Sequence, residues 1–232
     1  MLAATQMIDA QEYSSALELL ARMRADPKYR YHPMILKLWD RLGQHAVRVG
    51  LSEIWMVNSF MTHLHAVNAL ALASDGSVVL TGSDDHTLCM WDAHKQDCLH
   101  RLIGHDDAVT SLAMMPGNRY ALSGSTDGTL RVWRLETEDC LAVLTGHTSQ
   151  VNSVGLSPDA LFAVSASNDQ TVRIWDLAHN RIHRILKGHT HYVKAAAFTP
   201  DGQSVISASW DKTVRIWNVV SGECQQVLSG HA

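Results

Sequence analysis

Residues 146–176 read GHTSQVNSVGLSPDALFAVSASNDQTVRIWD, and this stretch decides the fold. Short β-prone runs over 151–156, 161–166 and 171–176 are separated by turn-forming pairs, Pro158-Asp159 and Asn168-Asp169. The stretch therefore predicts three antiparallel strands joined by tight turns. A fourth run at 140–144 has the same character.

The same pattern recurs along the chain with a period of 42 residues. A histidine opens every unit, and an aspartate and then a tryptophan follow it at constant spacing. These positions are His63, His105, His147 and His189; Asp85, Asp127, Asp169 and Asp211; and Trp91, Trp133, Trp175 and Trp217. A repeat of this length indicates a stacked architecture, because one small sheet cannot bury both of its apolar faces alone.

A 42-residue period with a Gly-His pair and a Trp-Asp pair resembles the WD40 repeat family, over residues 63 to 232. The resemblance implies a mainly β fold of β-propeller blades, with strands a to d in each unit. Four complete blades are expected, and these names are kept below: blades 1, 2, 3 and 4 at 63–104, 105–146, 147–188 and 189–229.

The chain outside the four blades has a different pattern. Residues 1–51 are expected to form a small helical segment, whose part around Tyr13, Ala16 and Leu17 resembles half of a tetratricopeptide repeat. Within the repeat region, 52–232, residues 56–61 read as a strand d without partners and 230–232 as the start of a fifth blade. Propellers have about 4–8 blades, so we expect the chain to be part of a larger protein and its ring.

Every unit also contains a hydroxyl, a histidine and an aspartate, which are the residue types of a hydrolase triad. A catalytic site is needed once, whereas this set occurs four times, each time with a tryptophan. The WD40 resemblance implies instead a structural hydrogen-bond network in each blade. Its members are His63, Thr81, Asp85 and Trp91; His105, Ser123, Asp127 and Trp133; His147, Ser165, Asp169 and Trp175; and His189, Ser207, Asp211 and Trp217.

The hydroxyl of each network has an alternative two residues further on. These alternatives are Ser83, Ser125, Ser167 and Ser209. The earlier position alternates between Ser and Thr and is preferred. No catalytic residue is expected, and the chain is not expected to be an enzyme.

The cysteines and histidines do not form a metal-binding pattern. Cys98, Cys140 and Cys224 occupy one phase of the repeat, where the remaining unit has Ile182, so they are expected to be buried apolar strand residues. The chain has no C-x-x-C pair, and a third ligand is lacking near the pairs His63–His65 and His189–His191. No metal and no cofactor are predicted.

Blade 4 carries the strongest candidate for partner binding. The residue before the first valine of strand a is Ala66, Ala108, Gln150 and Tyr192 in successive blades. The residue before the network aspartate is Asp84, Thr126, Asn168 and Trp210. Only blade 4 has large aromatic residues at both positions, and His191 adjoins them, so these three residues are predicted to bind a partner.

The expected function is a scaffold that binds protein or peptide partners through the propeller face. A net charge of −4 argues against nucleic acid or an anionic membrane as the main partner, and the default location is the cytoplasm. Self-association through open propeller ends is a further expectation. The alternative is a sensor region of a larger kinase or NTPase, with the catalytic domain outside these 232 residues.

Overall fold

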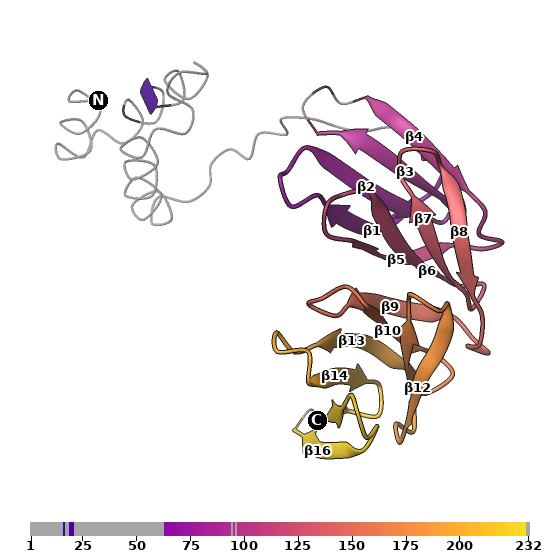
Figure 1. Cartoon of the computed structure of the whole chain (residues 1–232), viewed down its shortest axis with the longest axis vertical. Coiled ribbons are helices and arrows are strands. Elements are labelled where there is room, and N and C mark those ends of the chain that lie inside the picture. Colours follow the sequence, from indigo (N-terminus) through magenta and orange to yellow (C-terminus); the bar gives the residue numbers. More distant parts are fainter. Residues whose placement is uncertain (1–15, 17–18, 21–62, 94, 96, 231–232) are drawn as a thin grey trace. The chain divides into compact units, whose positions relative to one another are not determined.

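The computed structural model describes residues 63–93, 95 and 97–230, together with residues 16, 19 and 20 (Figure 1). The chain divides into two compact units, Met1–Val57 and Asn58–Ala232. Within the first unit, Ala16 and Leu20 are helical and fully buried, four residues apart. The rest of the predicted helical segment 1–51, strand 56–61 and most of the fifth-blade start lie outside the described residues.

The described part of the second unit consists of short strands of five to seven residues. In chain order they are β1 (Val67–Leu72), β2 (Val78–Ser83), β3 (Thr87–Asp92), β4 (Cys98–Ile103), β5 (Val109–Met114), β6 (Tyr120–Ser125), β7 (Leu130–Arg134), β8 (Asp139–Leu144), β9 (Val151–Leu156), β10 (Phe162–Ser167), β11 (Thr171–Asp176), β12 (Arg181–Lys187), β13 (Val193–Phe198), β14 (Ser204–Ser209), β15 (Thr213–Asn218) and β16 (Cys224–Ser229).

These strands form four antiparallel sheets, each a simple meander of four consecutive strands. The prediction of a mainly β chain with four four-stranded blades is thereby confirmed. Blade 1 is the sheet β1–β4, and blades 2, 3 and 4 are β5–β8, β9–β12 and β13–β16. No helix in the described ranges has the length and apolar character needed to cross a membrane.

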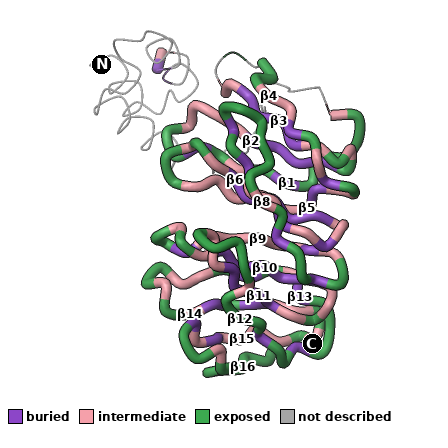
Figure 2. The backbone as a smooth tube through the Cα atoms, turned by 45° about the vertical axis from the view of Figure 1, so that its right-hand side comes forward, coloured by how far each residue is buried: buried purple, intermediate pink, exposed green. Residues whose placement is uncertain are grey.

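Successive blades stack face to face. Strand a of each blade contacts strands a and b of the blade before it: β5 lies against β1 and β2, β9 against β5 and β6, and β13 against β9 and β10. Blades 1 and 4 therefore lie at opposite ends of the stack, as both views show (Figures 1 and 2). Each internal blade is covered on both faces.

Burial follows this stacking. The first valine of strand a is fully buried in Val109, Val151 and Val193, but the equivalent Val67 of blade 1 is 52% exposed. At the other end, every residue of β16 is exposed (Figure 2). The same residue type is thus core or surface depending only on whether a neighbouring blade is present.

The valine packs closely against a small residue on strand b of the preceding blade. A Cβ added to Gly124 would lie 2.7 Å from Cγ1 of Val151 and 2.8 Å from Cγ1 of Val154. The equivalent residue of blade 3 is Ala166, which is buried in one cluster with Val193, so a small residue at this position is common to the blade interfaces.

We predict that Gly124→Ala lowers the free energy of unfolding by about 1–3 kcal/mol, because the added methyl overpacks the interface between blades 2 and 3. The second substitution Val151→Ala removes Cγ1 of Val151, one of the three side-chain atoms that the added methyl would meet, so the double variant should lose less than the sum of the two single losses. Urea denaturation of both single variants and the double variant measures the coupling. Strictly additive losses would contradict the packing account.

The structure corrects one sequence-based expectation. Cys98, Cys140 and Cys224 are exposed, not buried, and only Cys89 is a buried thiol. Strand d is the outermost strand of each sheet, so its first residues face solvent even where an apolar residue is common.

Candidate interaction site

Each blade brings its predicted network residues together in one hydrogen-bond chain. In blade 3, the Nε1–H of Trp175 donates to Oγ of Ser165 (2.8 Å), and that oxygen lies 2.7 Å from Nε2 of His147. The Nδ1 atom of His147 lies 2.6 Å from Oδ2 of Asp169. The chain links strand b, strand c and the loop that enters strand a.

The other three networks repeat this geometry closely. The Trp–hydroxyl distance is 2.8 Å in all of them, the hydroxyl–His distance is 2.7–2.8 Å and the His–Asp distance is 2.7–2.9 Å. The histidine and tryptophan rings meet edge to face, with centroids 6.0–6.4 Å apart. The arrangement therefore belongs to the repeat and not to one site.

The two alternative hydroxyls of each blade have separate roles. The earlier hydroxyl, such as Ser165, bonds the tryptophan and histidine. The later one, Ser167, accepts from the backbone N–H of Asp169 (3.0 Å) and donates to the carbonyl of Ser149 (3.1 Å). The later serine thus fixes the turn between strands b and c against the loop before strand a.

A further network member escaped the sequence reasoning. Thr171 donates its hydroxyl to Oδ1 of Asp169 (2.6 Å), and its backbone N–H donates to the same oxygen (2.9 Å). Thr87, Thr129 and Thr213 make the same pair of bonds in the other blades. The signal was present in the sequence, since a threonine follows every network aspartate by two residues.

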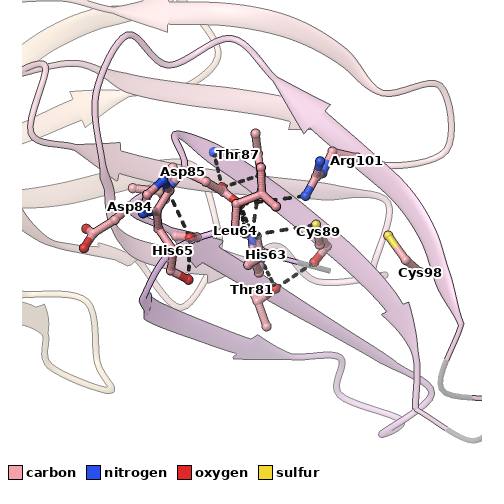
Figure 3. Close-up of polar contacts among 12 residues, drawn as sticks. His63, Leu64, His65, Thr81, Asp84, Asp85, Thr87, Cys89, Cys98 and Arg101 are labelled. Carbon is pink, nitrogen blue, oxygen red and sulfur yellow. Dashed lines mark hydrogen bonds and ion pairs between the residues drawn. The ribbon is translucent and has the colours of Figure 1, made fainter. Parts of the chain in front are cut away.

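Blade 1 departs from the others in how it places a guanidinium beside the network aspartate. In blade 3, Arg173 of strand c lies 3.8 Å from Oδ2 of Asp169. Blade 1 has Cys89 at that position, and its cross-strand partner Arg101 of β4 lies 3.7 Å from Oδ2 of Asp85 (Figure 3). The sulfur also lies 3.9 Å from Nδ1 of His63. The arginine thus lies on strand d in blade 1 and on strand c in blade 3. In both blades a guanidinium group lies beside the network aspartate.

Protonation within the networks follows from burial and hydrogen bonding. Burial lowers the pKa of His105 and of His147, against the opposing effect of Asp127 and Asp169. Burial also acts to raise the pKa of Asp169, but hydrogen bonds from His147 and Thr171 outweigh it and hold that pKa well below its ordinary value. The lowered pKa leaves His105 and His147 neutral near pH 7, each with Nδ1–H donated to an ionised carboxylate.

This protonation state makes the serine a structural link. The neutral Nε2 atom of His147 accepts the hydroxyl proton of Ser165, whose oxygen accepts from Trp175. Ser123 and Ser165 are fully buried, and Ser207 is 1% exposed, so no substrate reaches their Oγ atoms. Within the described ranges, no group of three or more His, Cys, Asp or Glu side chains is placed to hold a metal ion.

The aromatic residues of blade 4 lie together at the surface. Tyr192 is 38% exposed and Trp210 is 59% exposed, and their ring centroids are 5.5 Å apart. The ring of His191 lies 4.6 Å from that of Tyr192 and 5.6 Å from that of Trp210. Nζ of Lys194 lies 4.6 Å from the centroid of Trp210, a cation–π contact. These four residues are called the aromatic cluster below.

The model of the family described as WD domain, G-beta repeat matches residues 55–92, 96–134, 138–176 and 180–218. The chain belongs to the WD40 repeat family. WD40 repeats generally serve as protein-interaction scaffolds and are typically non-catalytic. Among curated proteins, WD repeat-containing protein 18 of Bos taurus is 42% identical over 43 residues, which make up 18% of this chain and 10% of that protein. The chain thus matches only a small part of that relative.

We predict that Asp127→Ala lowers the free energy of unfolding by about 1–3 kcal/mol, because buried His105 and Thr129 lose their acceptor. Asp106, an exposed residue beside the same histidine, is the matched control, and Asp106→Ala should change stability by less than about 0.5 kcal/mol. Urea denaturation compares the two. Equal losses would show that the network contributes no more than the surface.

We predict that acid weakens the fold. Because the folded-state pKa of His105 and His147 is lowered, the unfolded chain binds more protons below about pH 6.5, so stability decreases as the pH falls through that range. The lowered pKa of Asp169 adds a further loss below about pH 4. Urea midpoints at pH 7.5, 6.5 and 5.5 should decrease in that order.

The histidine contribution is separable by substitution. The double variant His105→Gln, His147→Gln removes two of the buried titrating groups, so its midpoint should change less between pH 7.5 and 5.5 than that of the wild type. A wild-type midpoint that stays constant, or rises, on acidification would contradict the assignment of neutral buried histidines.

Proposed function

We propose that this chain is a non-catalytic scaffold that binds protein or peptide partners through the rim of blade 4. The observation that carries the proposal is the exposure of two clustered aromatic side chains, Tyr192 and Trp210, beside His191. Tyrosine and tryptophan bury a large area with few rotatable bonds, and they are enriched at interface hot spots. The partner residue expected there is an apolar or aromatic anchor.

The backbone beneath the aromatic cluster is held firmly, which favours binding without a large ordering cost. The N–H of Trp210 donates to the carbonyl of Tyr192 (3.0 Å), and the hydroxyl of Ser209 donates to the carbonyl of His191 (3.1 Å). Immediately behind them, His189 and Asp211 form the blade 4 network. The two aromatic rings thus project from backbone that is hydrogen-bonded on both sides.

Charge along the same rim changes from one end of the stack to the other. Asp84 and Asp106 are exposed on blades 1 and 2, whereas exposed Lys212 and half-buried Lys194 lie on blade 4. A partner segment with basic residues over blades 1 and 2 and its anchor over blade 4 would match this distribution. Opposite charges would steer the segment into one direction along the rim.

We predict that Tyr192→Ala combined with Trp210→Ala weakens binding of peptides selected from a random display library on the wild-type chain. The expected loss is about 2 kcal/mol or more, a factor of about 30 in Kd, because the hot-spot area is removed. Fluorescence anisotropy of each selected peptide measures it. The melting temperature should change little, since both side chains are exposed.

The control is Gln150→Ala, which truncates a side chain at the equivalent rim position of blade 3 and should leave Kd within about twofold, the size expected of a near-neutral contact. A large loss of melting temperature with retained peptide affinity would show that the aromatic cluster is internal packing. Equal affinity of wild type and double variant would place the binding surface elsewhere.

Three broader expectations belong with this proposal. The helical segment 1–51, with its resemblance to a tetratricopeptide repeat, would add a second surface for protein partners. A cytoplasmic location is proposed as well. Self-association is proposed because apolar side chains such as Leu70 and Leu228 are exposed on the two end blades. No feature of the described residues favours the kinase or NTPase sensor.

A further inference from the structure

The junction between blades 3 and 4 carries a groove beside the hairpins that connect strands a and b. Its volume is about 300 Å³, and its apolar lining includes Phe162 of β10, Phe198 of β13 and the pair Val219-Val220 of the turn after β15. Phe162 and Phe198 also pack against the buried cluster that joins the two blades. The groove therefore lies over the core between two neighbouring blades, and both blades line it.

The exposure of this groove does not depend on the end of the stack. Asp201 lies on the hairpin between strands a and b of blade 4, and its equivalent in the internal blade 3, Asp159, is exposed as well. The equivalents of Val220 in the internal blades are Glu136 and Ala178, and both are exposed. These positions are thus open to solvent even where a blade has a neighbour on each side.

Each of the two blades contributes one carboxylate to the lining, Asp159 from blade 3 and Asp201 from blade 4. Oδ1 of Asp159 accepts hydrogen bonds from Oγ of Ser157 (2.5 Å) and from the backbone N–H of Leu161 (3.0 Å). Oδ1 of Asp201 accepts the equivalent pair of bonds within its own turn, 2.5 and 3.0 Å long. Among the described residues, neither Oδ2 atom has a hydrogen-bond or ion-pair partner. One oxygen of each carboxylate is thus fixed by its turn, and the other can accept from a ligand.

The charge of the groove is negative. The hydroxyl hydrogen bonds to Oδ1 lower the pKa of both Asp159 and Asp201, so the two carboxylates are ionised at neutral pH. The described lining contains no basic side chain. Arg184 of β12 donates its Nη2 to the carbonyl of Val220 (2.8 Å), which ties that turn to blade 3. The groove therefore combines an apolar surface with two negative charges.

The other two junctions lack this combination. At the positions of Phe162 and Phe198 they have Val78 with Met114 and Tyr120 with Leu156. At the positions of the two aspartates they have Asp75 with Gly117 and Gly117 with Asp159. Two of the three phenylalanines of the chain are thus found at the one junction that has a carboxylate on both hairpins.

This groove is separate from the aromatic cluster. Asp201 lies on the hairpin before β14, whereas Trp210 directly follows that strand. A strand of six residues spans about 20 Å. The two sites therefore lie at opposite ends of the blade, and one side chain cannot contact both.

We propose that this groove binds a partner segment in which an aliphatic side chain lies between two basic residues. The aliphatic side chain would pack against Phe162, Phe198 and Val220. The long stems of the flanking lysine or arginine residues would carry their cationic groups to Oδ2 of Asp159 and of Asp201. Opposite charges favour such a segment over an acidic one, and carboxylates already held by their turns lose little freedom on binding. The groove is a second binding surface, beyond the one proposed on the opposite rim.

The test uses the 232-residue chain and short peptides selected on it from a display library with the fixed centre Lys-Leu-Arg. Fluorescence anisotropy of each selected peptide gives its Kd. The double variant Asp159→Asn, Asp201→Asn should raise Kd about tenfold or more, because the charges are lost while the turns keep an oxygen acceptor. Val220→Ser should raise Kd about fivefold, because an exposed apolar contact is removed.

Asp75→Asn is the matched control. Oδ1 of Asp75 accepts the same kinds of turn bond, from the backbone N–H (3.0 Å) and the hydroxyl (2.7 Å) of Ser77, but its junction lacks the second carboxylate. This variant should leave Kd within about twofold of the wild type. Circular dichroism melting checks that each variant is folded, and the two single aspartate variants replace the double variant if it is not.

Salt and peptide charge supply two further readouts. The Kd of the wild type should rise with sodium chloride concentration, because salt screens exposed charges, and the Kd of the double variant should depend less on salt. Peptides with glutamine in place of the central lysine and arginine should bind the wild type about tenfold more weakly.

Four results would overturn the proposal: a library that yields no binder, an unchanged Kd in the double aspartate variant, an equal loss in Asp75→Asn, or equal binding of the glutamine peptides. Combined Tyr192→Ala and Trp210→Ala should leave the Kd of these peptides unchanged. A loss there would show that they bind the aromatic cluster instead. Peptides that depend on the aromatic cluster should in turn be insensitive to the double aspartate variant, so failure of one site is distinguishable from failure of the other.

Discussion

The close packing of a strand-a valine against a small residue of the preceding blade is the contact on which the rest of this domain depends. Neither face of a four-stranded sheet can remain in water without cost, so every blade needs a neighbour on both sides. The absent side chain of Gly124 sets the separation at which Val151 fills the space between two sheets. The buried clusters accordingly combine residues of adjacent blades, as in the packing of Val164 with Val193.

The hydrogen-bond networks serve this packing by fixing loops. Strands b and c pair through their own backbone bonds, and the networks add side-chain bonds from these strands to the loop that enters strand a. His147 joins that loop to Ser165 and Asp169, and Thr171 orients the carboxylate. Rim residues such as Tyr192 are then presented from a loop that these hydrogen bonds tie to the sheet. A rigid rim is useful for recognition because little freedom is lost on binding.

Periodicity predicts which kinds of residue recur and hence the four blades, their limits and the network members. It does not predict which way a variable position faces. Cys98 is predicted to be buried because the equivalent residue of blade 3 is Ile182. In the structure this position lies at the start of the outermost strand and is exposed in blade 1. The repeat pattern also does not predict that Arg101 replaces the arginine missing at Cys89. The two residues lie on different strands, and only the structure shows that they are cross-strand partners. The contacts of Lys194 with Trp210 and with Asn152 of blade 3 depend likewise on which strands the structure places side by side.

Every strand pairing among the described residues of this domain lies within one 42-residue unit. Chain closure before each pairing therefore spans only a short loop, which keeps the entropic cost of forming a sheet small compared with β folds that pair distant segments. Communication along the stack passes through side-chain contacts alone, from each blade to the next. Folding should then behave like a line of coupled elements, in which an ordered blade serves as the template for its neighbour.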